Sequence, residues 1–369
     1  MIVSVLQENL LKALSRTGRI VPVKPQLPIV QNVLVQAEKD RLRIVSTNLE
    51  TTEIVYVGAK IEREGGVCVS SRLLLEFVSS LPQSTVKMIV KEGSLTVQCG
   101  GFRATIPGIA PTEFPPVAGH SKKNEVIIEK KEIIGAIERV LFSAATDEGR
   151  PLLAGVRIMQ KQGETTLAAT DGYRLSVKKI TLTTKEDLDL LVPARALGEV
   201  VKVCTEDKSS KTISFIRSQD GQASFLVGDT EIMTRLIDGE YPNFEKIIPT
   251  KHNTRILLDK EALEKAVRSA SVFARDNANI IRFHVENQTL TISANTPQVG
   301  EDEVDVDAKV DGEGGDIAFN SRFLTEFLSN YPENELLFEM TGALNPGVFR
   351  PTKDDSYLHI IMPVRVASG

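Results

Sequence analysis

The chain has 369 residues, which is more than one compact domain usually holds and is also three times 123. Its composition, 41% hydrophobic and 25% charged, is typical of a globular protein and excludes collagen-like and intrinsically disordered chains. Lys and Arg total 44 against 49 Asp and Glu, so the net charge is −5, which argues against tight electrostatic binding of nucleic acid.

The first predicted element is a helix around residue 10, and it recurs twice. Apolar residues fall at positions i, i+3 and i+4 of each copy, which is the spacing of one buried helix face. The copies are Leu10/Ala13/Leu14, Ile133/Ala136/Ile137 and Leu263/Ala266/Val267, separated by 123 and 130 residues. Strand-like stretches follow each copy: LPIVQNVLVQ from Leu27, RPLLAGVRIM from Arg150 and a looser IIRFHVENQ from Ile280.

A second helix follows in each copy, after a short β-type run. Arg72, Arg195 and Arg322 mark its start and are 123 and 127 residues apart. Apolar residues at i, i+3, i+4 and i+7 predict one buried stripe per helix: Leu74/Phe77/Val78/Leu81, Leu197/Val200/Val201/Cys204 and Leu324/Phe327/Leu328/Tyr331. A period of this length indicates that one structural unit occurs three times.

Turn dipeptides separate alternating apolar runs and predict antiparallel hairpins: Glu92-Gly93, Asp220-Gly221 and Asn287-Gln288. Each repeat reads helix, strands, helix, strands, without the strand–helix alternation of a doubly wound sheet. We therefore expect an α+β fold whose two helices per repeat pack side by side on antiparallel sheets. Proline-rich stretches at residues 107–124 and 238–253 predict three domains, 1–122, 123–250 and 251–369.

The chain carries no apolar run of about 18 residues, and its first residues lack the basic start and cleavage site of a signal peptide. We therefore expect a cytoplasmic protein that binds no membrane. Cys68, Cys99 and Cys204 lie far apart without a CxxC pair, which predicts reduced thiols. The histidines, at positions 120, 252, 284 and 359, lack metal-ligand spacing, so we predict ordinary surface or core roles and no metal or cofactor.

Two segments contain acidic residues that are candidates for a functional site. In ATDGYRLS, Asp171 and Arg174 are candidates for acid–base chemistry. However, Asn48 and Asn295 occupy the positions that match Asp171 in the other repeats, which favours a role for Asp171 in a turn. The acidic run at residues 301–311 alternates with valines. This alternation predicts a half-buried strand with a charged outer face rather than a calcium site.

The basic residues of the repeated helices allow two interpretations. Arg72, Arg195 and Arg322 are each followed four residues later by a glutamate, which predicts i,i+4 ion pairs worth a few tenths of a kcal/mol. Alternatively, these arginines share a surface that contacts DNA phosphates with other helix cations, namely Lys12, Arg16, Arg139, Lys202 and Arg268. With 5% aromatic residues and no helix-turn-helix pattern, any DNA contact would be independent of sequence.

Three longer motifs carry a resemblance to a known family: ATDGYRLS at 169–176, LIDGEYPNFEKIIP at 236–249 and HIIMPVRV at 359–366. With the length and the threefold repeat, they make the chain resemble the beta subunit of bacterial DNA polymerase III, the processivity sliding clamp. The resemblance implies a head-to-tail homodimer whose six similar domains form a ring, with helices lining the hole. It implies a non-catalytic protein that encircles double-stranded DNA without sequence specificity and tethers the polymerase III catalytic subunit.

In this family a pocket between the second and third domains accepts a short linear motif from DNA polymerases, the clamp loader and repair factors. The matching positions combine aliphatic walls, an adaptable methionine and polar groups at the edge. They are Leu153, Thr170, Gly172, Tyr173, Arg174, Leu175, Pro242, Lys246, Ile247, Ile360, Ile361, Met362, Pro363, Val364, Arg365 and Val366. Tyr173 and Lys246 replace the histidine and arginine of the best-known members, which affects the peptide preference.

The resemblance also implies a dimer interface and DNA-facing positions. Ala104 and Ile106 match one side of the interface, and Val272 and Phe273 match the other. Lys24, Arg72 and Arg195 match basic DNA-facing residues, whereas Lys12, Arg16, Arg139, Lys202, Arg268 and Arg322 are predicted from the repeat.

Two other hypotheses remain open at this point: an enzyme using Asp171 and Arg174, and a peptide-binding scaffold that has the fold without the ring. The net charge of −5 is compatible with the ring, since encirclement holds DNA without a basic surface throughout.

Overall fold

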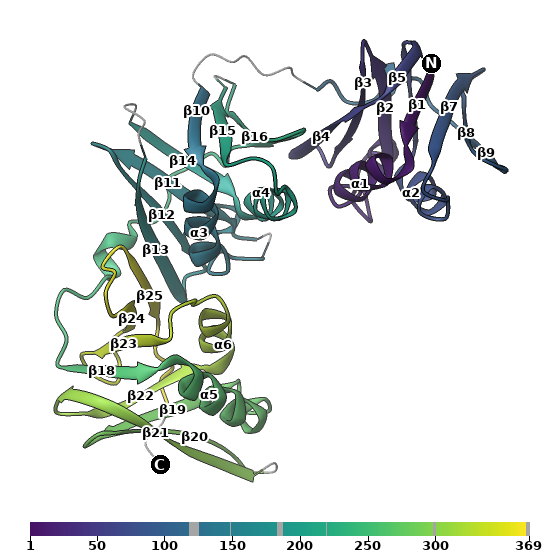
Figure 1. Ribbon diagram of the computed structural model, residues 1–369. Coiled ribbons are helices and arrows are strands. Elements are labelled where there is room, and N and C mark those ends of the chain that lie inside the picture. The colour runs from purple at the N-terminus through teal and green to yellow at the C-terminus, as the bar shows by residue number, and fades with distance from the viewer. Residues whose placement is uncertain (118–124, 148, 183–186, 219, 298–299, 367–369) are drawn as a thin grey trace. The chain divides into compact units, whose positions relative to one another are not determined.

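Figure 1 shows the computed structural model, which describes residues 1–117, 125–147, 149–182, 187–218, 220–297 and 300–366. The predicted boundary between residues 122 and 123, and His120, lie outside these described residues. Each third of the chain has the same order of elements: a strand, a helix, four or five strands, a second helix and three strands. The threefold repeat and the α+β class are therefore confirmed.

The three copies have the following bounds. The first has β1 (Ile2–Leu6), α1 (Gln7–Thr17), β2 (Asn32–Glu38), β3 (Arg41–Thr47), β4 (Thr51–Gly58), β5 (Lys60–Arg63), β6 (Gly65–Ser70), α2 (Ser71–Ser79), β7 (Thr85–Lys91), β8 (Ser94–Cys99) and β9 (Phe102–Pro107). The second has β10 (Glu125–Glu129), α3 (Lys130–Leu141), β11 (Gly155–Lys161), β12 (Glu164–Thr170), β13 (Arg174–Thr181), β14 (Leu188–Pro193), α4 (Ala194–Glu206), β15 (Thr212–Arg217), β16 (Gln222–Val227) and β17 (Thr230–Arg235). The third has β18 (Thr254–Asp259), α5 (Lys260–Ala274), β19 (Ile280–Glu286), β20 (Thr289–Thr296), β21 (Gly300–Gly312), β22 (Gly315–Asn320), α6 (Ser321–Ser329), β23 (Glu335–Met340), β24 (Gly347–Pro351) and β25 (Tyr357–Ile361).

The strand ahead of each first helix is absent from the predicted order. The segments IVSVL, EVIIE and TRILLD form β1, β10 and β18, and each pairs with the first strand after the second helix of its copy: β7, β15 and β23. These pairings join residues about 80 positions apart, for example Ile2 with Ile89. Short strands held by such distant partners leave little signal in a local pattern.

The chain separates into two compact units, residues 1–131 with 195–236, and residues 132–194 with 237–369. The first unit contains a five-stranded sheet, β5-β1-β7-β8-β9, and an eight-stranded sheet, β10-β15-β16-β17-β4-β3-β2-β6. The second contains a twelve-stranded sheet, β14-β11-β12-β13-β25-β24-β23-β18-β21-β20-β19-β22. Within each unit a sheet thus continues from one copy into the next, through β17–β4 or β13–β25.

Neighbouring strands are antiparallel throughout the described pairs, and the predicted hairpin turns are present. Glu92 and Gly93 have φ values of 51° and 74°, and Asn287 has 53°. These left-handed conformations match the right-handed twist of the flanking strands.

The predicted helix stripes are buried. Leu10, Ala13 and Leu14 of α1 and Leu74 and Val78 of α2 lie in one apolar core with β1–β4 and β6–β9. The third copy has a core of its own under α5 and α6, rich in phenylalanine: Phe283, Phe319, Phe327, Phe338 and Phe349. In these two copies both helices therefore contribute to one core, as predicted.

The described helices include none long and apolar enough to span a membrane. The three cysteines are free and buried, and burial raises the pKa of the Cys68 and Cys204 thiols to about 11. His359 is buried in the core, whereas His252 and His284 lie at the surface. The Asp316 carboxylate, 2.8 Å from His284 Nδ1, raises the pKa of that imidazole.

Gly347 of β24 offers a test of packing in the third core. A methyl group on its Cα would lie 2.9 Å from Cε2 of Phe338 and would also press on Phe319. Because both rings are fully buried, we expect Gly347→Ala to lower the free energy of unfolding by about 1–3 kcal/mol, as overpacking does. Urea unfolding measures this. The matched control is Gly58→Ala, where the new methyl would contact nothing within 4 Å; equal effects of the two substitutions would contradict the packing described.

Candidate partner-binding and DNA-facing sites

The turn between β12 and β13 is built around Asp171. Its Oδ1 accepts hydrogen bonds from the backbone N–H groups of Tyr173 at 2.9 Å and Arg174 at 3.0 Å, and its Oδ2 accepts one from Arg174 Nε at 3.1 Å. Gly172 has a φ of +90°, in the left-handed region that favours glycine. The turn role predicted for Asp171 is confirmed.

The matching residue of the first copy has the same role. Asn48 Oδ1 accepts from the backbone N–H groups of Glu50 at 3.0 Å and Thr51 at 2.7 Å. The third copy differs, because β20 continues through this position and Asn295 Nδ2 instead donates to Glu301 Oε2 at 3.4 Å. This turn is therefore present in the first and second copies and is replaced by a continuous strand in the third.

Arg174 is held by two carboxylates and two aromatic rings. Besides Asp171, its Nη2 lies 2.6 Å from Glu326 Oε2, and its guanidinium lies 4.8 Å from the ring centroid of Phe323 and 5.6 Å from that of Phe142. The side chain is only 7% exposed. Arg174 Nη1 is buried and has no hydrogen-bond partner among the described residues, so this donor is the part of the side chain still able to gain a partner.

An apolar surface lies beside this turn. Tyr173 is 59% exposed and stacks on Phe323, with ring centroids 6.2 Å apart, and its carbonyl accepts a hydrogen bond from the Met362 N–H at 2.8 Å. We call the exposed apolar members of the predicted pocket in this unit the apolar patch: Tyr173, Ile247, Met362 and Val366. Phe323 was not predicted; the only signal was an aromatic residue at a repeat position held by Leu73 and Ala196 in the other copies.

Three predicted pocket residues lie beneath the surface. Leu175 of β13 pairs with Ile360 of β25, and both pack under Tyr241 and Phe244. Ile361 points to the other side of the sheet and belongs to the core of the third copy. None of the three is exposed, because Tyr241 and Phe244 cover one face of these strands and the core of the third copy covers the other. They form the floor of the predicted pocket rather than its open wall.

The other predicted pocket residues surround this floor. Thr170 is buried and its N–H donates to the hydroxyl of Tyr241 at 3.0 Å, while burial raises the Tyr241 pKa to about 12. Leu153, Pro363 and Val364 are half-buried, and Pro242, Lys246 and Arg365 are exposed. The Val364 N–H donates to the carbonyl of Ala318 at 2.8 Å, which fixes the last described residues against β22.

Comparison with known proteins covers nearly the whole chain. Family models match in order the N-terminal, central and C-terminal domains of the DNA polymerase III beta subunit, at residues 1–118, 127–243 and 245–365. The chain belongs to the DNA polymerase III beta subunit family.

Individual relatives agree with this assignment. The curated "Beta sliding clamp" of Synechococcus elongatus is 29% identical over 98% of both chains, and that of Staphylococcus aureus is 25% identical over 98% of both. The solved DNA polymerase III beta chain of Streptococcus pneumoniae is 25% identical, with a TM-score of 0.94 over 99% of this chain and 100% of that one. The DNA polymerase sliding clamp of Bacillus subtilis, 23% identical, shares the fold with a TM-score of 0.94 over 99% of both chains.

The nine predicted DNA-facing cations fall into different classes in this beta subunit. Lys12, Lys24 and Arg322 are exposed, and their side chains have no charged partner among the described residues; Arg195 is also exposed. Arg72, Lys202 and Arg268 are exposed but paired on their own helices, with Glu76 at 2.8 Å, Glu199 at 2.7 Å and Glu264 at 2.9 Å.

The predicted i,i+4 pair at the second helix is present for Arg72, whereas the described ion pairs of the other two glutamates are with different cations. Glu199 pairs instead with Arg19 at 3.0 Å, and Glu326 pairs with Arg174. Arg275 at the end of α5 was not predicted, yet with Arg322 it lines a shallow cavity of about 430 Å³. It has no counterpart in the repeated helix pattern that would have revealed it.

For Arg16 and Arg139 the predicted DNA-facing position is wrong. Arg16 is 5% exposed and donates to Glu206 Oε2 and Thr230 Oγ1, each at 2.8 Å. Arg139 pairs with Glu333 and lies over the ring of Tyr357, 5.0 Å from its centroid. Their carboxylate partners lie 190 and 194 residues away in the sequence, so helix periodicity could not show that these cations are neutralised inside the protein.

Arg16 belongs to a partly buried charge cluster in the first unit. Arg19 adds contacts to Glu206 at 2.5 Å and Glu199 at 3.0 Å, and Glu53 of β4 lies close to this cluster with no exposed surface. Neither carboxylate oxygen of Glu53 has a hydrogen-bond partner among the described residues. Burial raises the Glu53 pKa to about 7; the negative charges of Glu199 and Glu206 act in the same direction, and the arginines oppose it.

The raised pKa predicts a pH-dependent stability. A carboxyl whose pKa is higher in the folded than in the unfolded protein contributes stability at low pH, and that contribution is lost as the pH rises through about 7. Glu53→Gln mimics the protonated form, so its stability relative to wild type should increase by roughly 2 kcal/mol between pH 5 and pH 8. Urea unfolding at both pH values tests this, with the exposed Glu8→Gln as control. A difference between Glu53→Gln and wild type that stays constant would contradict it.

Proposed function

We propose that this beta subunit is a non-catalytic sliding clamp that encircles double-stranded DNA and tethers DNA polymerase III and other replication factors. The observation that carries the proposal is the threefold repeat in a chain that matches all three domains of the family in order. We keep 1–122, 123–250 and 251–369 as the proposed domain limits. The work of such a clamp takes place on DNA in the cytoplasm.

The pairing of the sheets supports a closed head-to-tail ring. The last strand of the second copy, β17, pairs with β4 of the first, and the last strand of the third copy, β25, pairs with β13 of the second. The last strand of the first copy, β9, pairs only with β8 in the described structure. In the third copy the strand that corresponds to β4 and β13 is β21, whose residues 300–307 pair only with β20. The same rule therefore pairs β9 of one subunit with β21 of another.

The two free edges also have complementary charge. Arg103 on β9 is exposed, and β21 carries the exposed carboxylates of Glu301, Glu303, Asp305 and Asp307. Unpaired strand edges of this length are rarely left open in a stable protein. We propose that a second copy covers them, with the edge around Ala104 and the half-buried Phe273 and exposed Val272 in the interface. Ile106 is 3% exposed, so it supports the edge from the core instead of contacting the partner.

A ring explains how an acidic protein stays on DNA. The proposed contacts are the exposed cations of the helices and the 20–27 loop: Lys12, Lys24, Arg72, Arg195, Lys202, Arg268 and Arg322. Several of them are already paired with glutamates, which weakens their hold on phosphate and favours movement along the duplex. A closed ring then keeps the protein on DNA although its contacts with the phosphates are weak.

The apolar patch supports partner binding in the second unit. Tyr173 belongs to the turn that Asp171 holds rigid, Met362 is hydrogen-bonded to Tyr173, and methionine adapts to partners of different shape. We propose that a short segment of a polymerase, the clamp loader or a repair factor binds here. An acceptor on that segment would also satisfy the buried Nη1 donor of Arg174.

The ring predicts retention that depends on DNA ends. Protein threaded at high concentration onto bead-tethered linear DNA should stay bound after the free end is blocked with streptavidin, and should leave from an open end. Val272 is 49% exposed at the proposed interface, and Val272→Glu should bury an unpaired charge there and raise the dimer dissociation constant at least about tenfold. That variant should lose the end-dependent retention.

Sedimentation velocity provides the control for this experiment. Wild type should sediment as a dimer, and a substitution away from the interface, Ile127→Ala on β10, should leave both dimer and retention unchanged. If the wild type is a monomer, or if its release from DNA does not depend on whether the end is blocked, the hypothesis of a peptide-binding scaffold without a ring is favoured instead.

The apolar patch predicts which substitutions weaken the binding of a partner peptide. The probe is a fluorescent peptide of the last residues of the polymerase III catalytic subunit from the same organism. Tyr173→Ala combined with Met362→Ala removes two exposed apolar anchors and should weaken binding at least about tenfold in fluorescence anisotropy. Deletion of residues 362–369 should abolish binding but keep the dimer. Ile127→Ala should bind normally, and retained affinity in the deletion would refute the site.

A further inference from the structure

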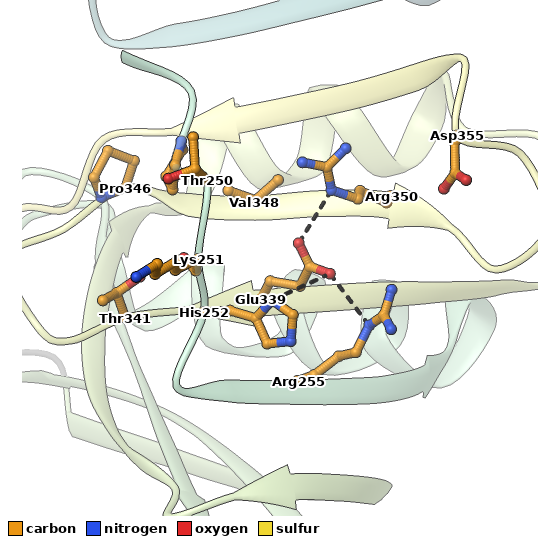
Figure 2. Close-up of a pocket in the computed structure, with 11 residues that line it drawn as sticks. Thr250, Lys251, His252, Arg255, Glu339, Thr341, Pro346, Val348, Arg350 and Asp355 are labelled. Atoms are coloured by element: carbon orange, nitrogen blue, oxygen red, sulfur yellow. Dashed lines mark hydrogen bonds and ion pairs between the residues drawn. The ribbon is translucent and has the colours of Figure 1, made fainter. Parts of the chain in front are cut away.

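A polar cavity of about 230 Å³ opens on the sheet of the third copy, outside every site described above (Figure 2). Strands β18, β23 and β24 form its floor, and residues 249–252, ahead of β18, form one side. The charged or titratable side chains that line it are Lys251, His252, Arg255, Glu339, Arg350 and Asp355. Nothing in the proposed ring, DNA contacts or apolar patch uses these groups.

Strand register brings three of them to one face. Arg255 of β18 stands directly opposite Glu339 of β23. Arg350 of β24 stands opposite Leu337, two residues before Glu339, so it points to the same side of the sheet. The floor of the cavity is therefore a carboxylate between two guanidinium groups.

Glu339 accepts a hydrogen bond from Arg350 and forms an ion pair with Arg255. Its side chain is 8% exposed, and its oxygens lie 3.0 Å from Arg350 Nε and 3.2 Å from Arg255 Nε. Among the described residues, no hydrogen bond reaches the Nη atoms of Arg255 or Arg350. Figure 2 shows both Nη pairs directed away from Glu339. Two guanidinium ends fixed at Nε and open at Nη form a preorganised site for an oxyanion.

The net charge of the side chains that line the cavity favours a ligand with a single negative charge. Lys251, Arg255 and Arg350 contribute three positive charges, and Glu339 and Asp355 contribute two negative ones. A carboxylate would neutralise the remaining charge of +1, whereas a phosphate dianion would leave an excess of negative charge. A second carboxylate between arginines also matches the bidentate geometry that guanidinium groups prefer.

The cavity is continuous with the floor of the proposed partner site. One cross-strand row runs from Arg255 through Glu339, Val348 and Ile360 to Leu175. Tyr241 and Phe244 cover the apolar end of this row, and residues 249–252 line its polar end. The apolar end of this row is therefore covered by the protein itself, whereas its polar end is open at the cavity.

We propose that this cavity binds a carboxylate, supplied by an acidic side chain or the chain end of a protein partner. That the partner is a replication factor rests on the proposed function, but the carboxylate site itself does not. Lys251 and the two Nη groups hold the charge, and Glu339 keeps the guanidinium groups in place.

The test titrates full-length protein with N-acetyl-glutamate amide and follows the side-chain Nε–H signals of Arg255 and Arg350 by NMR. A saturable shift is expected, and N-acetyl-glutamine amide, which lacks the charge, should cause none. Arg350→Gln should weaken carboxylate binding about tenfold. Arg350→Lys should have an intermediate affinity, because lysine keeps the positive charge but lacks the two parallel N–H donors of a guanidinium. The control Arg282→Gln should leave binding unchanged. Arg282 is an exposed arginine of the same domain.

Glu339→Gln separates a ligand site from a merely structural ion cluster. Removing the negative charge should tighten binding of the carboxylate several-fold, whereas a structural cluster would show no binding to enhance. The proposal is overturned if wild type shows no saturable shift, if Arg350→Gln binds as well as wild type, or if inorganic phosphate binds more tightly than the carboxylate. The readout does not involve DNA or the ring, so failure of the clamp proposal would leave it intact, and its own failure would leave the clamp proposal intact.

Discussion

Free strand edges are the constraint on which the rest of this structure depends. Each copy ends in a strand that its own sheet pairs on one side only, and an open edge invites a further strand. In two cases the chain supplies that strand itself, at β17–β4 and β13–β25. The third case, β9 and the first half of β21, cannot be met by the same rule without another subunit. The proposed ring closure is thus an expectation of strand pairing alone, before any DNA is considered.

The same continuity positions the binding surfaces of the second unit. Because β25 joins β13, the carboxyl-terminal residues lie beside the Asp171 turn, and Met362 meets Tyr173 although 189 residues separate them. The row from Leu175 to Arg255 then changes from apolar to charged along one sheet face. Tyr241 and Phe244 cover its apolar end, so the part of this face that a ligand can reach is the charged cavity.

The sequence predicted the elements that local periodicity controls. The stripes of α1 to α6 are buried because spacing at i, i+3 and i+4 reports one helix face directly. The strands β1, β10 and β18 escaped prediction because they are five or six residues long and held by distant partners. For the partner site, the motifs located the turn and the terminal strand, but the burial of Leu175, Ile360 and Ile361, and the support from Phe323, depend on sheet pairing. The polar cavity was invisible for the same reason, since Arg255, Glu339 and Arg350 are far apart in sequence.

Which cations are already paired with carboxylates was the property that the sequence predicted least well. This pairing affects how strongly the protein can hold DNA. The repeat and the family resemblance together predicted nine DNA-facing cations, yet Arg16 and Arg139 are paired with glutamates about 190 residues away. Three more are paired on their own helices. The surface left for DNA is therefore weaker than the count of arginines and lysines implies. Each phosphate contact adds to the barrier that a clamp must cross for every step along the duplex. In the proposed ring, which retains DNA by closure, few free cations would favour rapid movement. On that proposal, the glutamates paired with Arg72, Lys202 and Arg268 would serve movement of the clamp as well as the stability of its helices.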